Sequence, residues 1–147
     1  MFSTRIQSIF WVTAQFLLVF MIALWSLPWH LQARALIFGG TSILMGFWVM
    51  FHNRPGNFRI RPEPLPTARL ITTGPYRHMR HPMYVTLLLA TLALVSETPD
   101  TVDWILWGLL LVVLNFKATL EEHLLEERWP DYAEYRRQTW RFFPSLW

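Results

Sequence analysis

Two long apolar runs near the N-terminus constrain the fold more than any other feature of this sequence. They extend over residues 9–27 and 33–51, and each is long enough to cross about 30 Å of hydrocarbon as an α-helix. Every backbone polar group must be satisfied inside such a span, so each run predicts a transmembrane helix. A hydrophobic content of 53% in 147 residues indicates one membrane domain over residues 1–147.

Two later apolar runs predict a third and a fourth transmembrane helix, at residues 82–96 and 102–128. Their charge-free cores would span only about 20 Å, so both helices are expected to be short or tilted. The last helix has no breaker before Arg128 and is expected to continue beyond the membrane. We therefore predict an all-α integral membrane protein of four transmembrane helices, in which Ser42 and Gly46 mark a close helix contact.

Lysine and arginine lie almost entirely on one side of these spans. They gather in the loop of residues 52–81, at the end of the fourth helix and in the C-terminal segment 129–147, whereas the opposite side holds only Arg34. The positive-inside rule then predicts that both termini and the loop are cytoplasmic, as in a bacterial inner-membrane protein. Because the arginines flank apolar runs, they predict membrane lipids and not nucleic acid as partners.

A polar and aromatic cluster occupies residues 74–84, where the loop enters the third helix. Pro82 suits the first turn of a helix and biases His81 toward an extended conformation, so the helix is expected to begin here with His81 near its N-cap. Such a helix start favours an anionic ligand group, and Tyr76 and Tyr84 offer aromatic surface and hydroxyl donors. The same residues would also suit a basic anchor at the membrane interface.

A second cluster lies at the end of the fourth helix. Lys117 and Glu121 are four residues apart and share a helix face, which is expected to open onto one cavity. A carboxylate just beyond the hydrocarbon would hold a cationic ligand group, although a solvated helix end has the same composition. No metal site is predicted, because Pro82 prevents a helical His-x-x-His geometry at His78 and His81 and cysteine is absent.

Together the two clusters resemble the isoprenylcysteine carboxyl methyltransferase family, part of a membrane methyltransferase superfamily that also includes phospholipid N-methyltransferases. The order and spacing of short motifs in the C-terminal half carry the resemblance. These motifs are LITTGPY at 70–76, RHPMY at 80–84, EEHLL at 121–125, WPDYAEY at 129–135 and RFFP at 141–144.

The resemblance implies an enzyme that uses S-adenosyl-L-methionine to methylate a hydrophobic or lipid-like acceptor, such as a prenyl-cysteine carboxylate. It implies that the cytoplasmic loop and the C-terminal helix form the cofactor site, with Glu121 and Glu122 of the last helix closing it. The implied cofactor-binding residues are Ala68, Arg69, Leu70, Ile71, Tyr76, His81, Pro82, Met83, Tyr84, Glu121 and Glu122.

Lys117 stands where the isoprenylcysteine enzymes have an arginine implicated in binding the substrate carboxylate, so the resemblance implies a substrate-positioning role for it. The substitution keeps the charge but loses bidentate geometry, which leaves the acceptor open among a prenyl cysteine, a phospholipid amine, a small thiol and another hydrophobic acid. Two other functions are alternatives: an NADPH-dependent membrane reductase related to sterol reductases, and a non-catalytic lipid-binding module. The short chain and the pair Glu121 and Glu122 favour the methyltransferase.

Overall fold

A computed structural model describes most of the chain, and all of the regular structure in the described residues is helical. These residues are 4–27, 32–53, 61–63, 69–97 and 100–143. The elements are α1 (Thr4–Trp25), α2 (Ala33–His52), the short 3-10 helix η1 (Gly74–Arg77), α3 (Pro82–Val95), α4 (Thr101–Arg128) and α5 (Tyr132–Gln138). The predicted all-α class is confirmed.

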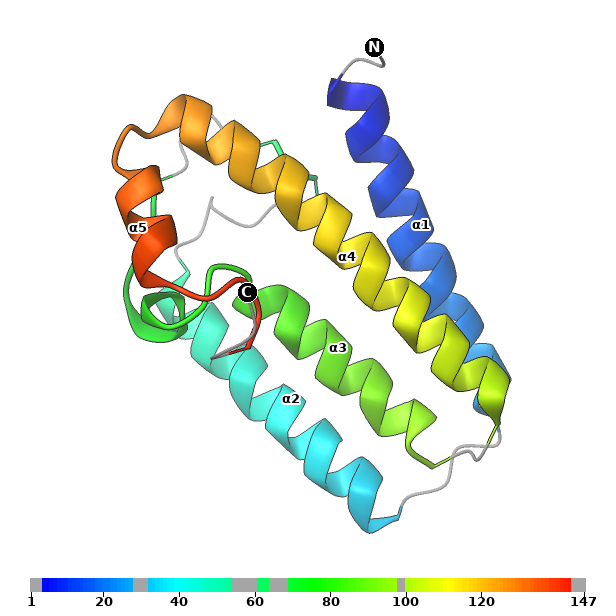
Figure 1. The fold of residues 1–147 in the computed structure, drawn as a ribbon. Helices are drawn as coiled ribbons and strands as arrows, with labels where there is room; N and C mark the ends of the chain where they lie inside the picture. The colour runs from blue at the N-terminus through cyan, green and yellow to red at the C-terminus, as the bar shows by residue number, and fades with distance from the viewer. Residues whose placement is uncertain (1–3, 28–31, 54–60, 64–68, 98–99, 144–147) are drawn as a thin grey trace.

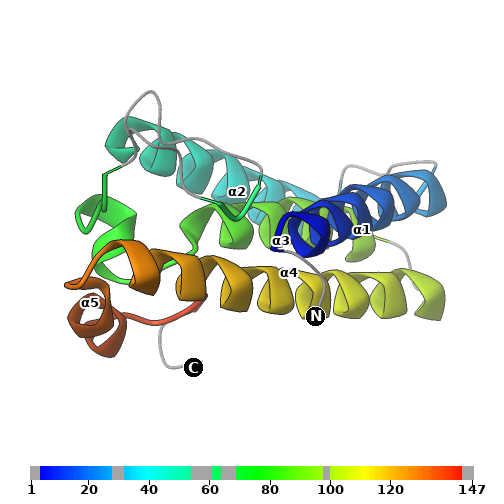
Figure 2. The same cartoon turned by 90° about the horizontal axis from the view of Figure 1, so that it is seen from above.

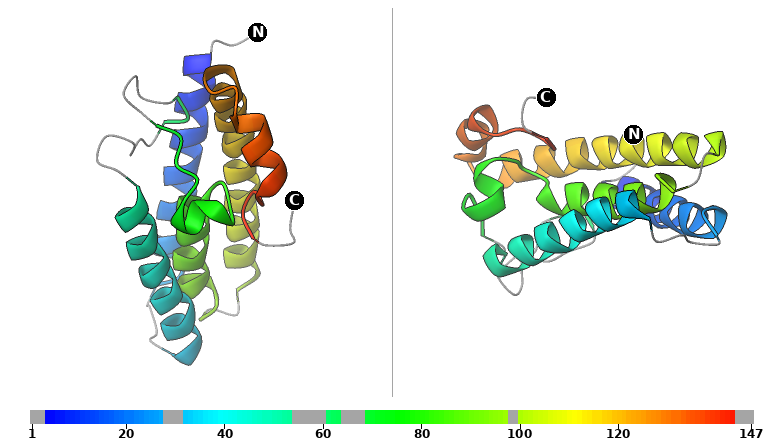
Figure 3. Two further views of the ribbon diagram at one scale, coloured as in Figure 1. Left: turned by 90° about the vertical axis from the view of Figure 1, so that its left-hand side faces the viewer. Right: turned by 90° about the horizontal axis from the view of Figure 1, so that it is seen from below.

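The four long helices run side by side, with α3 at the centre. α3 contacts α1, α2 and α4, and α1 packs mainly on α4 (Figure 1). The end of α2, the start of α3 and the end of α4 lie together with α5 at one end of the bundle, here called the loop end (Figure 2). Segments far apart in the sequence therefore meet at the loop end, as Figure 3 also shows.

Three helices among the described residues are long and apolar enough to cross a membrane: α1, α2 and α4. α3 is apolar but has only 14 residues, so the predicted count of four spans is not confirmed. Large apolar side chains point outward along the first two helices; Leu44 and Phe51, for example, are 72% and 84% exposed. Such a surface is unfavourable in water and suits lipid.

The helix boundaries agree with the sequence to within a few residues. α1 begins at Thr4, five residues before the predicted run, because its first turn is polar and therefore lies outside the apolar stretch. α4 continues without a break to Arg128, as expected from the absence of a helix breaker before this residue. α5 is a short helix of seven residues that begins after Pro130 and Asp131.

Helices α2 and α3 approach closely at the predicted pair of small residues. Ser42 Oγ donates a hydrogen bond to the backbone oxygen of Thr86 at 2.8 Å. A Cβ added to Gly46 would stand 3.4 Å from Thr86 Cγ2, which is van der Waals contact between the two helices. The close packing predicted for Ser42 and Gly46 is therefore confirmed.

Polar side chains hold the opposite end of the bundle together. Ser26 Oγ donates to Asp103 Oδ1 at 3.1 Å and so joins the end of α1 to the start of α4. The backbone N–H of Ala35, in the first turn of α2, donates to Glu97 Oε1 at 2.8 Å. These contacts satisfy groups at helix ends that would otherwise be costly to bury.

Gly74 allows the loop to turn against the end of α2. Its φ of 61° lies in the left-handed region that side chains with a Cβ rarely adopt, and a Cβ there would overlap the ring of His52. A glycine at this position therefore fixes η1 beside α2. Tyr76, on η1, reaches the loop end as a result.

Candidate functional site

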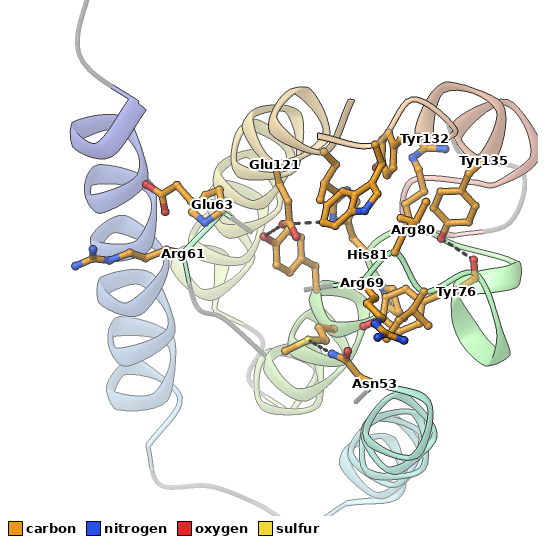
Figure 4. Close-up of a pocket in the computed structure, with 18 residues that line it drawn as sticks. Asn53, Arg61, Glu63, Arg69, Tyr76, Arg80, His81, Glu121, Tyr132 and Tyr135 are labelled. Atoms are coloured by element: carbon orange, nitrogen blue, oxygen red, sulfur yellow. Dashed lines mark hydrogen bonds and ion pairs between the residues drawn. The ribbon is translucent and has the colours of Figure 1, made fainter. Parts of the chain in front are cut away.

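A cavity of about 140 Å³ opens at the loop end (Figure 4). Its wall combines the end of α2, the loop before α3, the first turn of α3, the end of α4 and one face of α5. The lining residues are Asn53, Arg61, Pro62, Glu63, Arg69, Leu70, Ile71, Tyr76, Arg80, His81, Pro82, Met83, Tyr84, Glu121, Leu125, Trp129, Tyr132 and Tyr135. Whole small-molecule sites measure about 300–1,000 Å³, so a nucleoside cofactor would extend beyond the enclosed part.

α3 begins where the sequence predicted, although His81, with φ of −121° and ψ of 58°, does not have the extended conformation expected of it. His81 is the N-cap residue and Pro82 occupies the first helical position. The C-terminal segment pairs with the residues just before this helix, because the backbone N–H groups of Arg80 and His81 donate to the carbonyls of Trp140 and Arg141 at 2.8 and 3.1 Å. The cavity wall therefore depends on the chain end as well as on the loop.

Glu121 faces the cavity and is held by the first turn of α3. Its Oε2 accepts a hydrogen bond from the Tyr84 hydroxyl at 2.6 Å and lies 3.7 Å from His81 Nδ1. The rings of His81 and Tyr84 stack with centroids 5.1 Å apart. The Glu121 side chain is 30% exposed, so its carboxylate is oriented and still accessible to a ligand.

Glu122 is buried in an ion network and does not line the cavity. Its carboxylate accepts hydrogen bonds from Arg80 Nε at 2.8 Å and Arg141 Nη2 at 2.7 Å, and it lies 3.1 Å from His81 Nε2. The side chain is 2% exposed. The Glu122 carboxylate is therefore fully bonded to protein groups, and it holds together the segments that form the cavity wall.

Three tyrosines from η1 and α5 form an aromatic end of the cavity. Tyr135 donates through its hydroxyl to the backbone oxygen of Tyr76 at 2.7 Å, and the rings of Tyr132 and Tyr135 lie 5.7 Å apart. Burial raises the pKa of all three hydroxyls well above its usual range, so they stay neutral donors. The buried Tyr132 hydroxyl has no hydrogen-bond partner within the described ranges.

Lys117 is separated from this cavity. Its Nζ donates to Gln15 Oε1 of α1 at 2.6 Å and lies 5.1 Å from the centroid of the Tyr84 ring. The residue is 2% exposed and is absent from the cavity lining. The expectation that Lys117 and Glu121 open onto one cavity is thus not met, because the Tyr84 ring stands beside the ammonium.

The cavity brings together most of the residues predicted to bind the cofactor. Those in its lining are Arg69, Leu70, Ile71, Tyr76, His81, Pro82, Met83, Tyr84 and Glu121. Glu122 lies behind the wall, and Ala68 is outside the described residues.

Sequence reasoning missed several lining residues. Leu125, Trp129, Tyr132 and Tyr135 belong to the motifs that carry the family resemblance, and their spacing of three or four residues was an available signal. Other lining residues, such as Glu63, come from the Pro-rich loop, which has no periodicity to read. No group of three or more His, Asp or Glu side chains in the part of the chain described here is placed to hold a metal.

Fold and site define a membrane-embedded helical protein with a polar and aromatic cavity at one end of its bundle. The chain belongs to the phospholipid methyltransferase family, which matches residues 33–131. This family is part of the same superfamily of membrane methyltransferases as the isoprenylcysteine carboxyl methyltransferases, which confirms the resemblance seen in the sequence.

Two curated proteins are similar to part of the chain. It is 37% identical over 83 residues to the nickel-cobalt-cadmium resistance protein NccN of Alcaligenes xylosoxydans xylosoxydans, covering 54% of this chain and 38% of that protein. It is 37% identical over 79 residues to the cobalt-zinc-cadmium resistance protein CzcN of Cupriavidus metallidurans, covering 52% and 36%. The chain thus spans well under half the length of these relatives. No solved structure matches it.

The network around Glu122 predicts a large stability effect. Glu122→Gln removes the buried charge that faces Arg80 and Arg141, and breaking a buried pair costs about 3–5 kcal/mol. Thermal unfolding in detergent should show a marked loss. Glu126→Gln, whose partner Arg136 is 46% exposed, is the matched control and should cost about 1 kcal/mol or less. Equal effects would show that the network does not stabilise the wall.

Proposed function

We propose that this protein transfers a methyl group from S-adenosyl-L-methionine to a hydrophobic or lipid-like acceptor. Membership in the phospholipid methyltransferase family implies a membrane methyltransferase. The observation that carries the finer proposal is the cavity, in which the oriented carboxylate of Glu121, the start of α3 and an aromatic wall meet. A cofactor with a cationic sulfonium and a planar base has matching chemistry at the Glu121 carboxylate and at the aromatic wall.

Two orphaned polar atoms in the wall support binding of a polar ligand. One carboxylate oxygen of Glu63 and the hydroxyl of Tyr132 are buried without a hydrogen-bond partner among the described residues. Burying such groups costs about 1–3 kcal/mol each, which a ligand offering both a donor and an acceptor would recover. S-adenosyl-L-methionine offers both.

When bound, S-adenosyl-L-methionine supplies a methyl group that is already activated on a positively charged sulfur. The protein then has to align the reactants, exclude water and stabilise charge. Glu121 suits charge stabilisation, because the hydroxyl of Tyr84 fixes its carboxylate at the cavity surface. An acceptor that is already anionic needs no dedicated general base in this chain.

The position of Lys117 supports the proposal that the methyl acceptor enters the protein from the membrane. Its ammonium lies between α1 and α4 and has an amide oxygen of Gln15 as its partner; no ion pair found among the described residues includes it. A buried ammonium whose neighbours are a neutral amide and the ring of Tyr84 would be stabilised by an anionic headgroup. We propose that Lys117 positions such a headgroup, with the apolar part of the acceptor between the helices.

The proposal includes the membrane topology. The chain forms one domain with four spans, of which α3 is short, in the inner membrane of a bacterium with both termini in the cytoplasm. Support comes from the loop end, where arginines such as Arg69, Arg80, Arg136 and Arg141 gather near the site. The polar cofactor would then enter from the cytoplasm.

Reporter fusions test this topology. Fusions after residues 53 and 143 should report the cytoplasmic side, and a fusion after residue 97 should report the opposite side, because α3 then crosses the bilayer. A cytoplasmic signal after residue 97 would mean that α3 is not a span. A periplasmic signal after residue 143 would overturn the orientation and the route of the cofactor.

Cofactor binding tests the enzymatic proposal directly. The purified protein in detergent should bind S-adenosyl-L-methionine and not NADPH in calorimetric titrations. Glu121→Gln should weaken this binding by about 1–3 kcal/mol, the usual range for a charge-assisted contact. Glu127→Gln, whose side chain is 61% exposed, is the control and should bind normally. Binding of NADPH alone would favour the reductase, and binding of neither would favour a lipid-binding module.

Variants of Lys117 test the chemistry of the acceptor. With a farnesylated cysteine analogue as anionic acceptor, Lys117→Met should raise KM or lower kcat and leave the affinity for S-adenosyl-L-methionine nearly unchanged. Lys117→Arg should be tolerated, because the charge is kept. With a neutral amine or thiol as acceptor, neither change should matter. Loss of cofactor binding in Lys117→Met would place Lys117 in the cofactor site and contradict the separation by Tyr84.

A further inference from the structure

Glu63 is a cavity residue with an unexplained buried oxygen. It belongs to the described fragment 61–63 of the loop between α2 and α3, and it lines the cavity together with Arg61. Its Oε2 is buried without a hydrogen-bond partner in the described residues. An unpaired carboxylate oxygen loses its hydration without compensation, so this geometry favours a ligand that donates to Glu63.

The position of Glu63 within the cavity restricts what this ligand group can be. Glu63 and Arg61 lie on the side toward α1, Tyr132 and Tyr135 lie on the opposite side, and Glu121 lies between them (Figure 4). The tyrosine side offers ring faces and neutral hydroxyls, which suit a planar base. The Glu63 side offers a carboxylate with a buried, unpaired oxygen, which suits an ammonium.

S-adenosyl-L-methionine likewise has an aromatic part and a charged part at different positions along its length. Its adenine and its amino-acid group are at opposite ends, with the sulfonium and the ribose between them. If the base lies against the tyrosines and the sulfonium lies near Glu121, the amino-acid group reaches the side of Glu63. An ammonium brings a positive charge as well as a hydrogen-bond donor to the Glu63 carboxylate, so it satisfies this oxygen better than a neutral hydroxyl does.

We propose that Glu63 binds the ammonium of the amino-acid part of S-adenosyl-L-methionine and so fixes which way the cofactor lies in the cavity. This inference rests on the proposed function and adds a residue and an orientation to it. Glu63 and Glu121 then divide the two positive charges of the cofactor between them.

Three ligands separate these assignments. S-adenosylhomocysteine keeps the ammonium but lacks the sulfonium charge, and methylthioadenosine keeps the nucleoside but lacks the amino-acid group. Glu63→Gln should weaken binding of S-adenosyl-L-methionine and of S-adenosylhomocysteine about tenfold each and leave methylthioadenosine unchanged. Glu121→Gln should weaken S-adenosyl-L-methionine more than S-adenosylhomocysteine. Glu127→Gln should bind all three like the unmodified protein.

Each contrary result has a distinct meaning. If Glu63→Gln weakens the binding of methylthioadenosine equally, Glu63 contacts the nucleoside. If it weakens the binding of S-adenosyl-L-methionine alone, Glu63 contacts the sulfonium. Either result overturns the inference, and so does unchanged binding of all three ligands. If the unmodified protein fails to bind S-adenosyl-L-methionine, the proposed function itself fails. Melting temperatures without ligand show whether Glu63→Gln is folded, and Glu63→Asp, which keeps the charge, should retain more affinity than Glu63→Gln.

Discussion

The buried carboxylate of Glu122 is the interaction on which the loop end depends. It joins α4 to Arg80 and His81 before α3 and to Arg141 in the C-terminal segment, so one charge connects three stretches of chain that are distant in sequence. Arg80 also donates to the backbone oxygens of Arg136 and Thr139 at the end of α5. Without this charge, two arginines would be left partly buried and unneutralised, and the wall of the cavity would lose its common anchor.

Glu121 and Glu122 show how one residue step on a helix separates two roles. Successive residues point about 100° apart around the axis, so the second carboxylate turns into the wall while the first faces the cavity. His81 contacts both, at 3.7 Å from Glu121 and 3.1 Å from Glu122. The anchor therefore also sets the position of the ring that stacks on Tyr84, and Tyr84 in turn holds the carboxylate that faces the cavity.

The sequence predicted the helices well because their determinants are local. Apolar length indicated α1 and α2, and Pro82 indicated the start of α3. The span count was less secure, since 14 residues between Pro82 and a polar turn can be a short span or a buried hairpin arm. In the site, the residues of the family motifs that were predicted to bind the cofactor could be read from the sequence, whereas Glu63 could not. Glu63 lies in an irregular loop, where tertiary contacts and not a regular residue spacing decide the position of each side chain.

The position of Lys117 shows where helical periodicity stops being informative. Spacing placed Lys117 and Glu121 on one face, but it cannot show that the ring of Tyr84 from another helix lies between them or that Gln15 of α1 reaches the ammonium. Tyr84 thus contacts both groups: its hydroxyl holds Glu121 and its ring faces Lys117. Under the proposed function, an acceptor drawn to Lys117 from the membrane would meet the methyl group at Tyr84. Tyr84 would then form the common wall of the two binding sites, and the alignment of the reactants would depend on the same ring that orients Glu121.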